Sequence, residues 1–237
     1  YAVATFGNVS SAPLEMPLKD GSSTSLAVTN NWGEDYLLVK FNKDGEILWA
    51  TSIGSKFREN GTPDVTVGED GNPVICGVFN AANGNLTNES EEKREFYIGE
   101  QKYLLYPEQS KESALVKLNS TDGSVMWSRY FTGTGNQEVL KVQAVSGSNA
   151  LAVTGKANNQ IIVEGSAGLS TETVTHVSGA DHLFVISFDV DGKLLWSKSA
   201  SGDTSSEGKE ISSDDLGNIY VSGYFNGSLN WGDDIVL

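Results

Sequence analysis

The segment 188–192 reads FDVDG, the spacing with which calcium loops of the EF-hand type begin. Such a loop needs oxygen ligands at several further positions and a distant glutamate. The residues that follow are a lysine and three apolar residues, which cannot supply them. In the corresponding segments 41–45 (FNKDG) and 118–123 (LNSTDG), asparagine replaces Asp189 and only Asp-Gly recurs. We therefore interpret FDVDG as a tight turn between two strands.

Two acidic clusters follow a tryptophan, WGED at 32–35 and WGDD at 231–234. Acids beside an aromatic residue could bind calcium or a sugar. The simpler interpretation is a hairpin turn followed by the first aspartate of the next repeat. Calcium binding by these loops is left open, but no spacing supports it. We expect no metal site and no cofactor.

Few other residues have the chemistry for catalysis or metal binding. His176 and His182 are the only histidines, whereas zinc needs three or four suitably spaced ligands. Cys76 is the only cysteine and lies in the apolar segment PVICGVF, so we expect a buried thiol rather than a nucleophile. No G-x-S-x-G turn is present. We expect no catalytic residue, although a glycosidase-type pair of carboxylates is left open because acids are abundant.

Composition restricts the partners of the chain. Of its 237 residues, 38% are hydrophobic and 20% are charged, values typical of a globular protein. The net charge of −15 disfavours nucleic acid and anionic lipid as partners. No segment approaches the roughly 20 apolar residues of a membrane helix, so we expect no membrane insertion.

An internal repeat organises these residues. Each copy begins with a hairpin whose strands flank Asp-Gly and whose second strand carries a tryptophan: 36–49, 114–127 and 183–196. A second hairpin with glycine and asparagine in its turn follows: 64–79, 139–156 and 209–225. Asp-Gly between two apolar segments is a strong hairpin signal. The sequence therefore predicts three copies of a two-hairpin unit, separated by variable insert hairpins.

The predicted fold is all-β, a β-propeller whose blades are four-stranded antiparallel meanders. The expected units are a half unit at 1–34 and complete units at 35–112, 113–180 and 181–237. Three complete blades are fewer than the about 4–8 of a closed ring. We therefore expect either further blades of a longer chain or a second copy that meets this one through open sheet edges. The recurring Trp49, Trp127 and Trp196 are predicted to be buried between blades.

The repeat closely resembles the bacterial β-propeller repeat called SBBP. The first copy carries the resemblance at these positions: Asp35–Lys40, Asp44–Gly45, Trp49, Asp70–Asn72 and Gly77–Phe79. The second copy departs from it at Ser113 and at Lys156, which replaces an aromatic residue. The resemblance implies an extracellular or cell-surface bacterial protein that serves as a binding or scaffold module, with no shared catalytic residues. A weaker similarity, carried by ALVKLNSTDGSVMW (114–127), is to the repeats of quinoprotein dehydrogenases.

The functional expectation is a non-catalytic module that binds protein or glycan through rim loops and insert hairpins. Candidate contact residues are the insert aromatics Tyr97, Tyr103, Tyr106 and Trp231, although packing within the inserts is the simpler interpretation of these side chains. Two alternatives are left open. One is a propeller enzyme, either a quinone-dependent dehydrogenase or a glycan-active hydrolase, and the other is a structural spacer.

Overall fold

The computed structural model describes residues 1–7, 13–26, 34–55, 61–80, 95–104, 111–166, 168–175, 179–202 and 204–231. Within these ranges the chain consists of antiparallel strands joined by turns and contains no helix, so the all-β prediction is confirmed. No helix in this part of the chain is long and apolar enough to cross a membrane.

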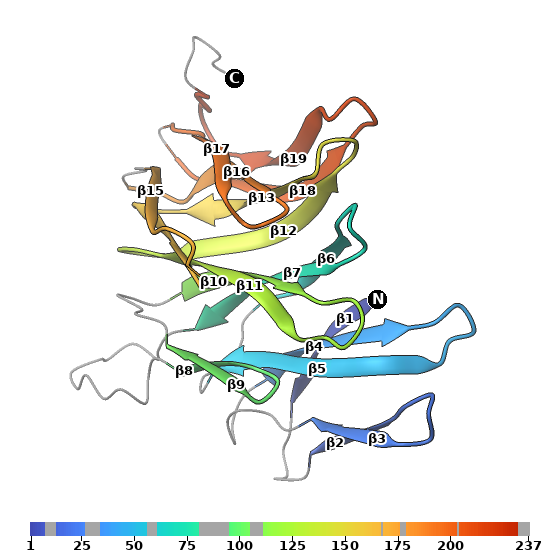
Figure 1. Cartoon of the computed structure of the whole chain (residues 1–237). Helices are drawn as coiled ribbons and strands as arrows, with labels where there is room; N and C mark the ends of the chain where they lie inside the picture. The colour runs from blue at the N-terminus through green and yellow to red at the C-terminus, as the bar shows by residue number, and fades with distance from the viewer. Residues whose placement is uncertain are drawn as a thin grey trace, which may run out of the picture.

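The strands form three sheets and two separate hairpins (Figure 1). The first sheet contains, in order, β1 (Ala2–Gly7), β4 (Glu34–Phe41), β5 (Ile47–Ser55), β8 (Glu95–Ile98) and β9 (Gln101–Leu104). The second contains β15 (Glu172–Thr175), β14 (Ile161–Gly165), β11 (Val125–Thr132), β10 (Lys111–Leu118), β7 (Pro73–Asn80) and β6 (Asp64–Val67). The third contains β12 (Gln137–Val145), β13 (Ala150–Ala157), β16 (His182–Asp189) and β17 (Leu194–Ser199). The hairpins are β2 (Leu14–Pro17) with β3 (Ser23–Leu26), and β18 (Ser206–Ser213) with β19 (Ile219–Phe225).

The pairing corrects one part of the sequence prediction. The two hairpins of a unit do not form one meander, because the second hairpin joins the first hairpin of the following unit. Strand β7 pairs with β10, and β13 pairs with β16. The insert hairpins explain this arrangement. Strand β8 pairs with the free edge of β5, and β14 pairs with the free edge of β11, so these edges are not left for the second hairpin of the same unit. Each of these sheets therefore draws strands from two consecutive units.

The sheets stack face to face, from the first sheet to the second and third and then to the β18–β19 hairpin (Figure 1). Three apolar cores fill the interfaces between successive layers. The first core lies between the first and second sheets, the second core between the second and third sheets, and the third core between the third sheet and the β18–β19 hairpin. Strand β10 shows why its sequence is apolar on both faces, since Ala114 and Val116 enter the first core whereas Leu115 enters the second. Side chains alternate between the faces of a strand, so a strand buried on both faces reads as a continuous apolar segment.

Candidate functional site

The turn at FDVDG is held by hydrogen bonds within the chain. The Asp189 carboxylate accepts hydrogen bonds from the backbone N–H groups of Asp191 and Lys193, at 3.0 and 2.8 Å. Asn42 makes the same two bonds in the first repeat, both at 2.9 Å. Gly192 has a φ of 82°, a conformation that glycine adopts without a Cβ clash. The prediction of a tight turn is confirmed. The Asp189 carboxylate accepts the same two turn hydrogen bonds as the Asn42 side chain.

This turn is bound by the sheet that precedes it in the stack. Trp127 Nε1 and Lys117 Nζ both donate to the backbone carbonyl of Val190, at 3.0 and 2.6 Å. Arg129 Nε donates to the carbonyl of Gly192 at 2.5 Å. The indole ring lies against Gly192, where an added Cβ would be 2.9 Å from a ring carbon. A tryptophan of one sheet thus holds the Asp-Gly turn of the next sheet.

The preceding layer contains the same contact. Trp49 Nε1 and Lys40 Nζ donate to the carbonyl of Ser120, at 3.0 and 2.5 Å. A Cβ added to Gly123 would lie 2.9 Å from the Trp49 ring. Because Trp49 and Trp127 are only 7% and 5% exposed, the prediction that they are buried between layers is confirmed.

In the third repeat, Trp196 has no Asp-Gly turn against its ring among the described residues. Trp196 is 43% exposed, so the prediction that it is buried between blades is wrong for this structure. Its sequence environment repeats, but no described residues supply the hairpin that would cover it. The lysine position is also changed, because Ser187 stands where Lys40 and Lys117 stand in the other copies, and its hydroxyl donates to Leu151.

The last strand that the structure describes, β19, is exposed in the same way. Its counterparts β7 and β13 are largely buried, whereas Tyr220 and Tyr224 of β19 are 57% and 51% exposed. Among the described residues of this last repeat, the exposed large apolar side chains are Leu195, Trp196, Leu216, Tyr220, Tyr224 and Phe225. Leu195 is set apart from the others, because its counterparts Leu48 and Met126 are exposed as well. We refer to the edge of β19 and the exposed side chains of Trp196, Tyr220, Tyr224 and Phe225 as the open end. It is the candidate binding surface of the described chain.

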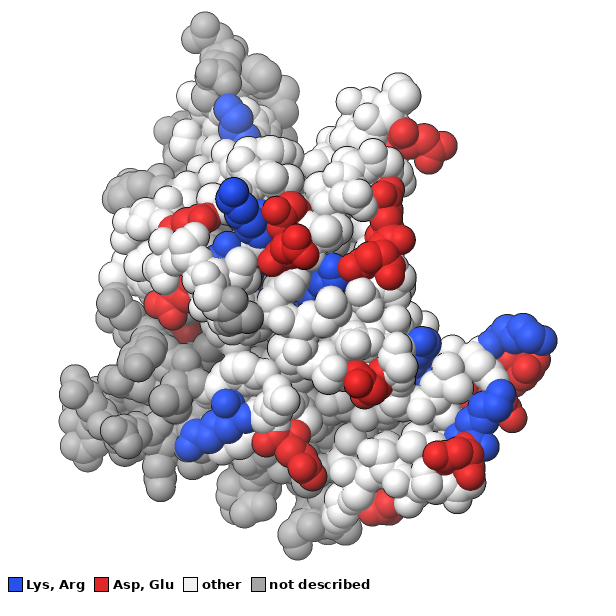
Figure 2. Space-filling model, in the orientation of Figure 1, with Lys and Arg blue, Asp and Glu red and all other residues white. Residues whose placement is uncertain are grey.

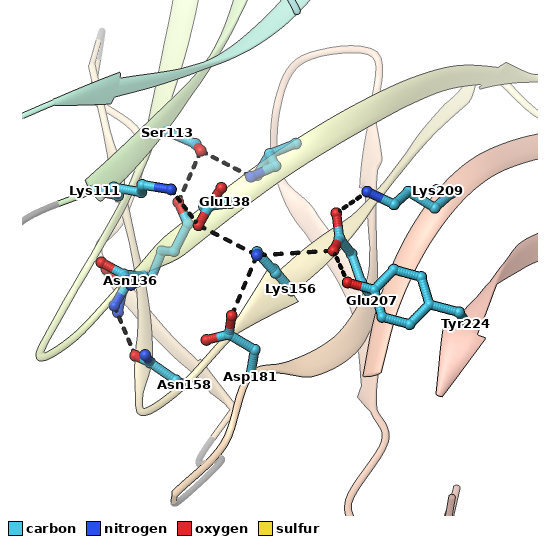
Figure 3. A network of polar contacts seen from close by, with 12 residues as sticks. Lys111, Ser113, Asn136, Glu138, Lys156, Asn158, Asp181, Glu207, Lys209 and Tyr224 are labelled. Carbon is cyan, nitrogen blue, oxygen red and sulfur yellow. Dashed lines mark hydrogen bonds and ion pairs between the residues drawn. The ribbon is translucent and has the colours of Figure 1, made fainter. Parts of the chain in front are cut away.

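A polar network lies beside the open end (Figure 3). Lys156 Nζ lies 3.7 Å from Glu138, 3.2 Å from Asp181 and 3.8 Å from Glu207. Burial of this ammonium group opposes its charge, but the carboxylates of Glu138, Glu207 and Asp181 outweigh burial and raise the pKa of Lys156. The network connects β13 with β12 and β18, so it couples the third sheet to the last hairpin.

The outer members of the network complete its charge balance. Lys111 approaches Glu138 at 3.1 Å, while Lys209 and the hydroxyl of Tyr224 both bind Glu207. Glu207 is buried, which alone would raise its pKa, yet these hydrogen bonds lower the pKa overall. Three lysines thus face three carboxylates, an arrangement suited to holding strands together. Sequence reasoning missed the network, although Lys156 stood out as a departure from the repeat.

The structure does not bring the predicted contact aromatics together. Tyr97 lies on β8 and Tyr103 on β9, where Tyr103 packs against the first core and its hydroxyl donates to Gln101 at 2.7 Å. Trp231 packs against the third core, and Tyr106 lies outside the described residues. Their role as ligand contacts stays a prediction.

The other candidate chemical groups are dispersed or buried. Across the described ranges, no three His, Cys, Asp or Glu side chains are placed to hold a metal ion. Asp35 is fully buried in β4, His182 is buried at the start of β16, and His176 lies outside the described residues. Cys76 is buried as predicted, and burial raises the pKa of its thiol far above the usual range.

Comparison with known proteins adds no relative. The chain matched no protein-family model, and a search of curated proteins found no match.

Proposed function

We propose that this chain is a non-catalytic binding or scaffold module built from β-propeller-type repeats, and that it binds protein. The repeats support this assignment, because the tryptophans and the charged side chains that stand out in them bind other parts of the same chain. Trp49 and Trp127 hold turns, and Lys156 is surrounded by carboxylates. The resemblance to SBBP repeats supports a location outside the cell or at the surface of a bacterium.

The open end carries the proposal. Trp196 and Tyr220 occupy positions that are buried in the first two repeats, and Tyr224 occupies one that is buried in the first; all three are accessible in the third repeat. Exposed aromatic residues are typical of protein interfaces. A strand edge beside them offers backbone N–H and C=O groups to an added strand. A protein segment satisfies both the aromatic surface and the strand edge, whereas a glycan satisfies only the first.

Charge supports a protein partner over nucleic acid. The chain has 31 acidic residues against 16 lysines and arginines. On the face shown in Figure 2, basic side chains mostly lie next to acidic ones rather than forming a continuous basic patch. A phosphate backbone needs such a patch for affinity.

Site-specific photo-crosslinking tests the proposal. A benzophenone amino acid at position 220, in place of the exposed Tyr220, should give discrete protein adducts when the chain is mixed with bacterial surface proteins. The same group in place of Met126, which is exposed on β11 away from the open end, is the matched control. The adducts should diminish in Trp196→Ser. Equal adducts at both positions, or turnover of a glycoside or an alcohol by the purified chain, would contradict the proposal.

A further inference from the structure

We infer that the open end binds a β-hairpin of the same repeat type, one with an Asn- or Asp-initiated Asp-Gly turn, and adds it to the edge of β19. The inference rests on the proposed function and names the kind of partner that this surface takes. It follows from three independent features of the last repeat. These are the edge of β19, the uncovered ring of Trp196 and the exposed face of β19 that carries Tyr220 and Tyr224.

The edge of β19 is the first feature. Every counterpart of this strand pairs with the first strand of a repeat hairpin, at an equivalent register. Gly77 of β7 faces Ala114 of β10, and Gly155 of β13 faces Phe184 of β16. Among the described residues β19 pairs only with β18, and Gly223 occupies the corresponding position. The equivalent register therefore places the first strand of the incoming hairpin antiparallel to β19, across from Gly223.

The ring of Trp196 is the second feature. In the two earlier copies, the indole N–H donates to the carbonyl of the residue after Asn119 or Asp189, and the ring lies against the turn glycine. The residue after Asn42 is Lys43, so its carbonyl is the equivalent acceptor in the first hairpin. Trp196 has the same place in its repeat and is exposed. A turn of this type would receive the same contact.

The exposed face of β19 is the third feature, because Ile219 and Val221 on its other face pack against the third core. Val74 and Val78 of β7 are fully or almost fully buried by the surrounding sheets. Tyr220 and Tyr224 take these two positions in β19 and are exposed, each with its hydroxyl bonded to a neighbouring carboxylate. Their rings are therefore held in place beside the edge that the hairpin would occupy.

The contact should be selective for the turn. Gly123 and Gly192 have positive φ values, and a Cβ on either would press into the indole ring. A partner therefore needs glycine at this position. Ser187 replaces the lysine that strengthens the two internal contacts, so the binding of a separate hairpin should be weaker than the contacts within the chain.

The probe that tests this inference is a peptide with residues 34–55 of this chain. An isolated hairpin is marginally stable in water, so its ends are joined by a disulfide between added cysteines. The full chain is titrated with this peptide in a calorimeter, and amide hydrogen exchange of β19 is followed with and without it. We expect binding that slows the exchange of β19. Trp196→Ser should lower the affinity about tenfold or more, as expected for an aromatic residue at the centre of an interface.

Two matched controls make the result specific. Leu195→Ser removes an exposed apolar side chain on the opposite face of β17, and it should change the affinity less than about threefold. A peptide with Gly45→Val should bind at least about tenfold more weakly, because valine disfavours the positive φ and adds atoms where the ring lies. Because Trp196 is exposed, an unchanged melting temperature shows that Trp196→Ser is folded.

The outcomes separate this inference from the proposed function. No peptide binding, equal binding by the Gly45→Val peptide, or unchanged affinity of Trp196→Ser overturns the inference. If crosslinking from position 220 still captures a protein, the binding function stands with another partner. Self-association that protects β19 and disappears in Trp196→Ser would support the inference, with a second copy as the source of the hairpin. Self-association that persists in Trp196→Ser would overturn it.

Discussion

The indole ring of Trp127 occupies the space that a side chain on Gly192 would fill, although 65 positions separate the two residues in the chain. The glycine belongs to a turn of the third sheet, and the tryptophan belongs to a strand of the second. A local feature, the Asp-Gly turn, is thus also a contact between layers. This relationship explains why the tryptophan and the turn recur together in the sequence.

Truncation of Trp127 should reveal the stability that this contact provides. Trp127→Ala should lower the free energy of unfolding by about 3–5 kcal/mol, because it leaves a cavity between two sheets and removes a hydrogen bond to Val190. Trp196→Ala should change it by less than about 1 kcal/mol, because that ring is partly exposed and leaves no enclosed cavity. Urea denaturation of both variants measures the difference. Equal losses would show that the two rings have the same surroundings.

The turn glycines should respond according to what covers them. Gly45→Ala places a side chain at positive φ with no atom within 4 Å of its Cβ, so it should cost about 1–2 kcal/mol. Gly192→Ala has the same backbone penalty and also meets the Trp127 ring, which adds about 1–3 kcal/mol. Thermal unfolding of the two variants isolates the ring contact. A Gly192→Ala protein as stable as Gly45→Ala would contradict the contact described here.

The polar network should make stability depend on pH at the alkaline end. Lys156 has a raised pKa in the folded chain, so its contribution is fully present below the unfolded value of about 10.4 and is lost as pH rises through the folded value. Lys156→Met should be less stable than the wild type by about 2–4 kcal/mol at neutral pH, because it leaves buried carboxylates short of a partner. This difference should shrink as the pH rises above about 10.

The control for that experiment is Lys193→Met, which removes an exposed lysine in the turn next to β17. It should stay within about 0.5 kcal/mol of the wild type at neutral pH. A stability difference for Lys156→Met that is constant across the alkaline range would show that the lysine contributes packing rather than charge.

Asp189 should be replaceable by asparagine. Asn42 accepts the same two backbone hydrogen bonds in the first repeat. Asp189→Asn keeps these bonds but removes a charge that attracts the buried Arg129, so it should lower the free energy of unfolding by no more than about 1 kcal/mol. Calcium at millimolar concentration should leave the melting temperature of both proteins unchanged. A calcium-dependent rise in the wild type that Asp189→Asn abolishes would restore the metal interpretation.

Local patterns were sufficient to predict the strands and the turns. The Asp-Gly pairs locate the hairpins, because such a turn is determined by a few neighbouring residues. The apolar segment around Cys76 correctly predicted that this cysteine is buried. The prediction of which hairpins share a sheet was wrong. The insert hairpins occupy one edge of the first hairpin in the first two repeats, and this decides which strands can pair there. Trp196 was assigned to the core from its place in the repeat, but burial depends on the neighbour that covers a residue.

The candidate site was harder to predict than the fold. Glu138, Asp181 and Glu207 come from three separate segments, and only the stacking of the sheets brings them around Lys156. The open end has the same sequence pattern as the buried copies, so exposure could not be read from it. The insert aromatics were proposed as contacts because the inserts vary, with packing within the inserts as the simpler interpretation. Tyr103 and Trp231 do pack against cores, and their role as ligand contacts stays a prediction.

The sharing of sheets between consecutive units has a consequence for how such a chain changes length. Because the second hairpin of one unit completes the sheet of the next, the repeat has no privileged starting point. A deletion from Gly77 to the equivalent Gly155 would join β7 to the end of β13 in phase, and the shortened chain would still alternate the same two hairpins. Insertion of one repeat period would likewise keep the two hairpins in alternation. Duplication within the gene can therefore begin at any codon of the period and still encode sheets of the same kind.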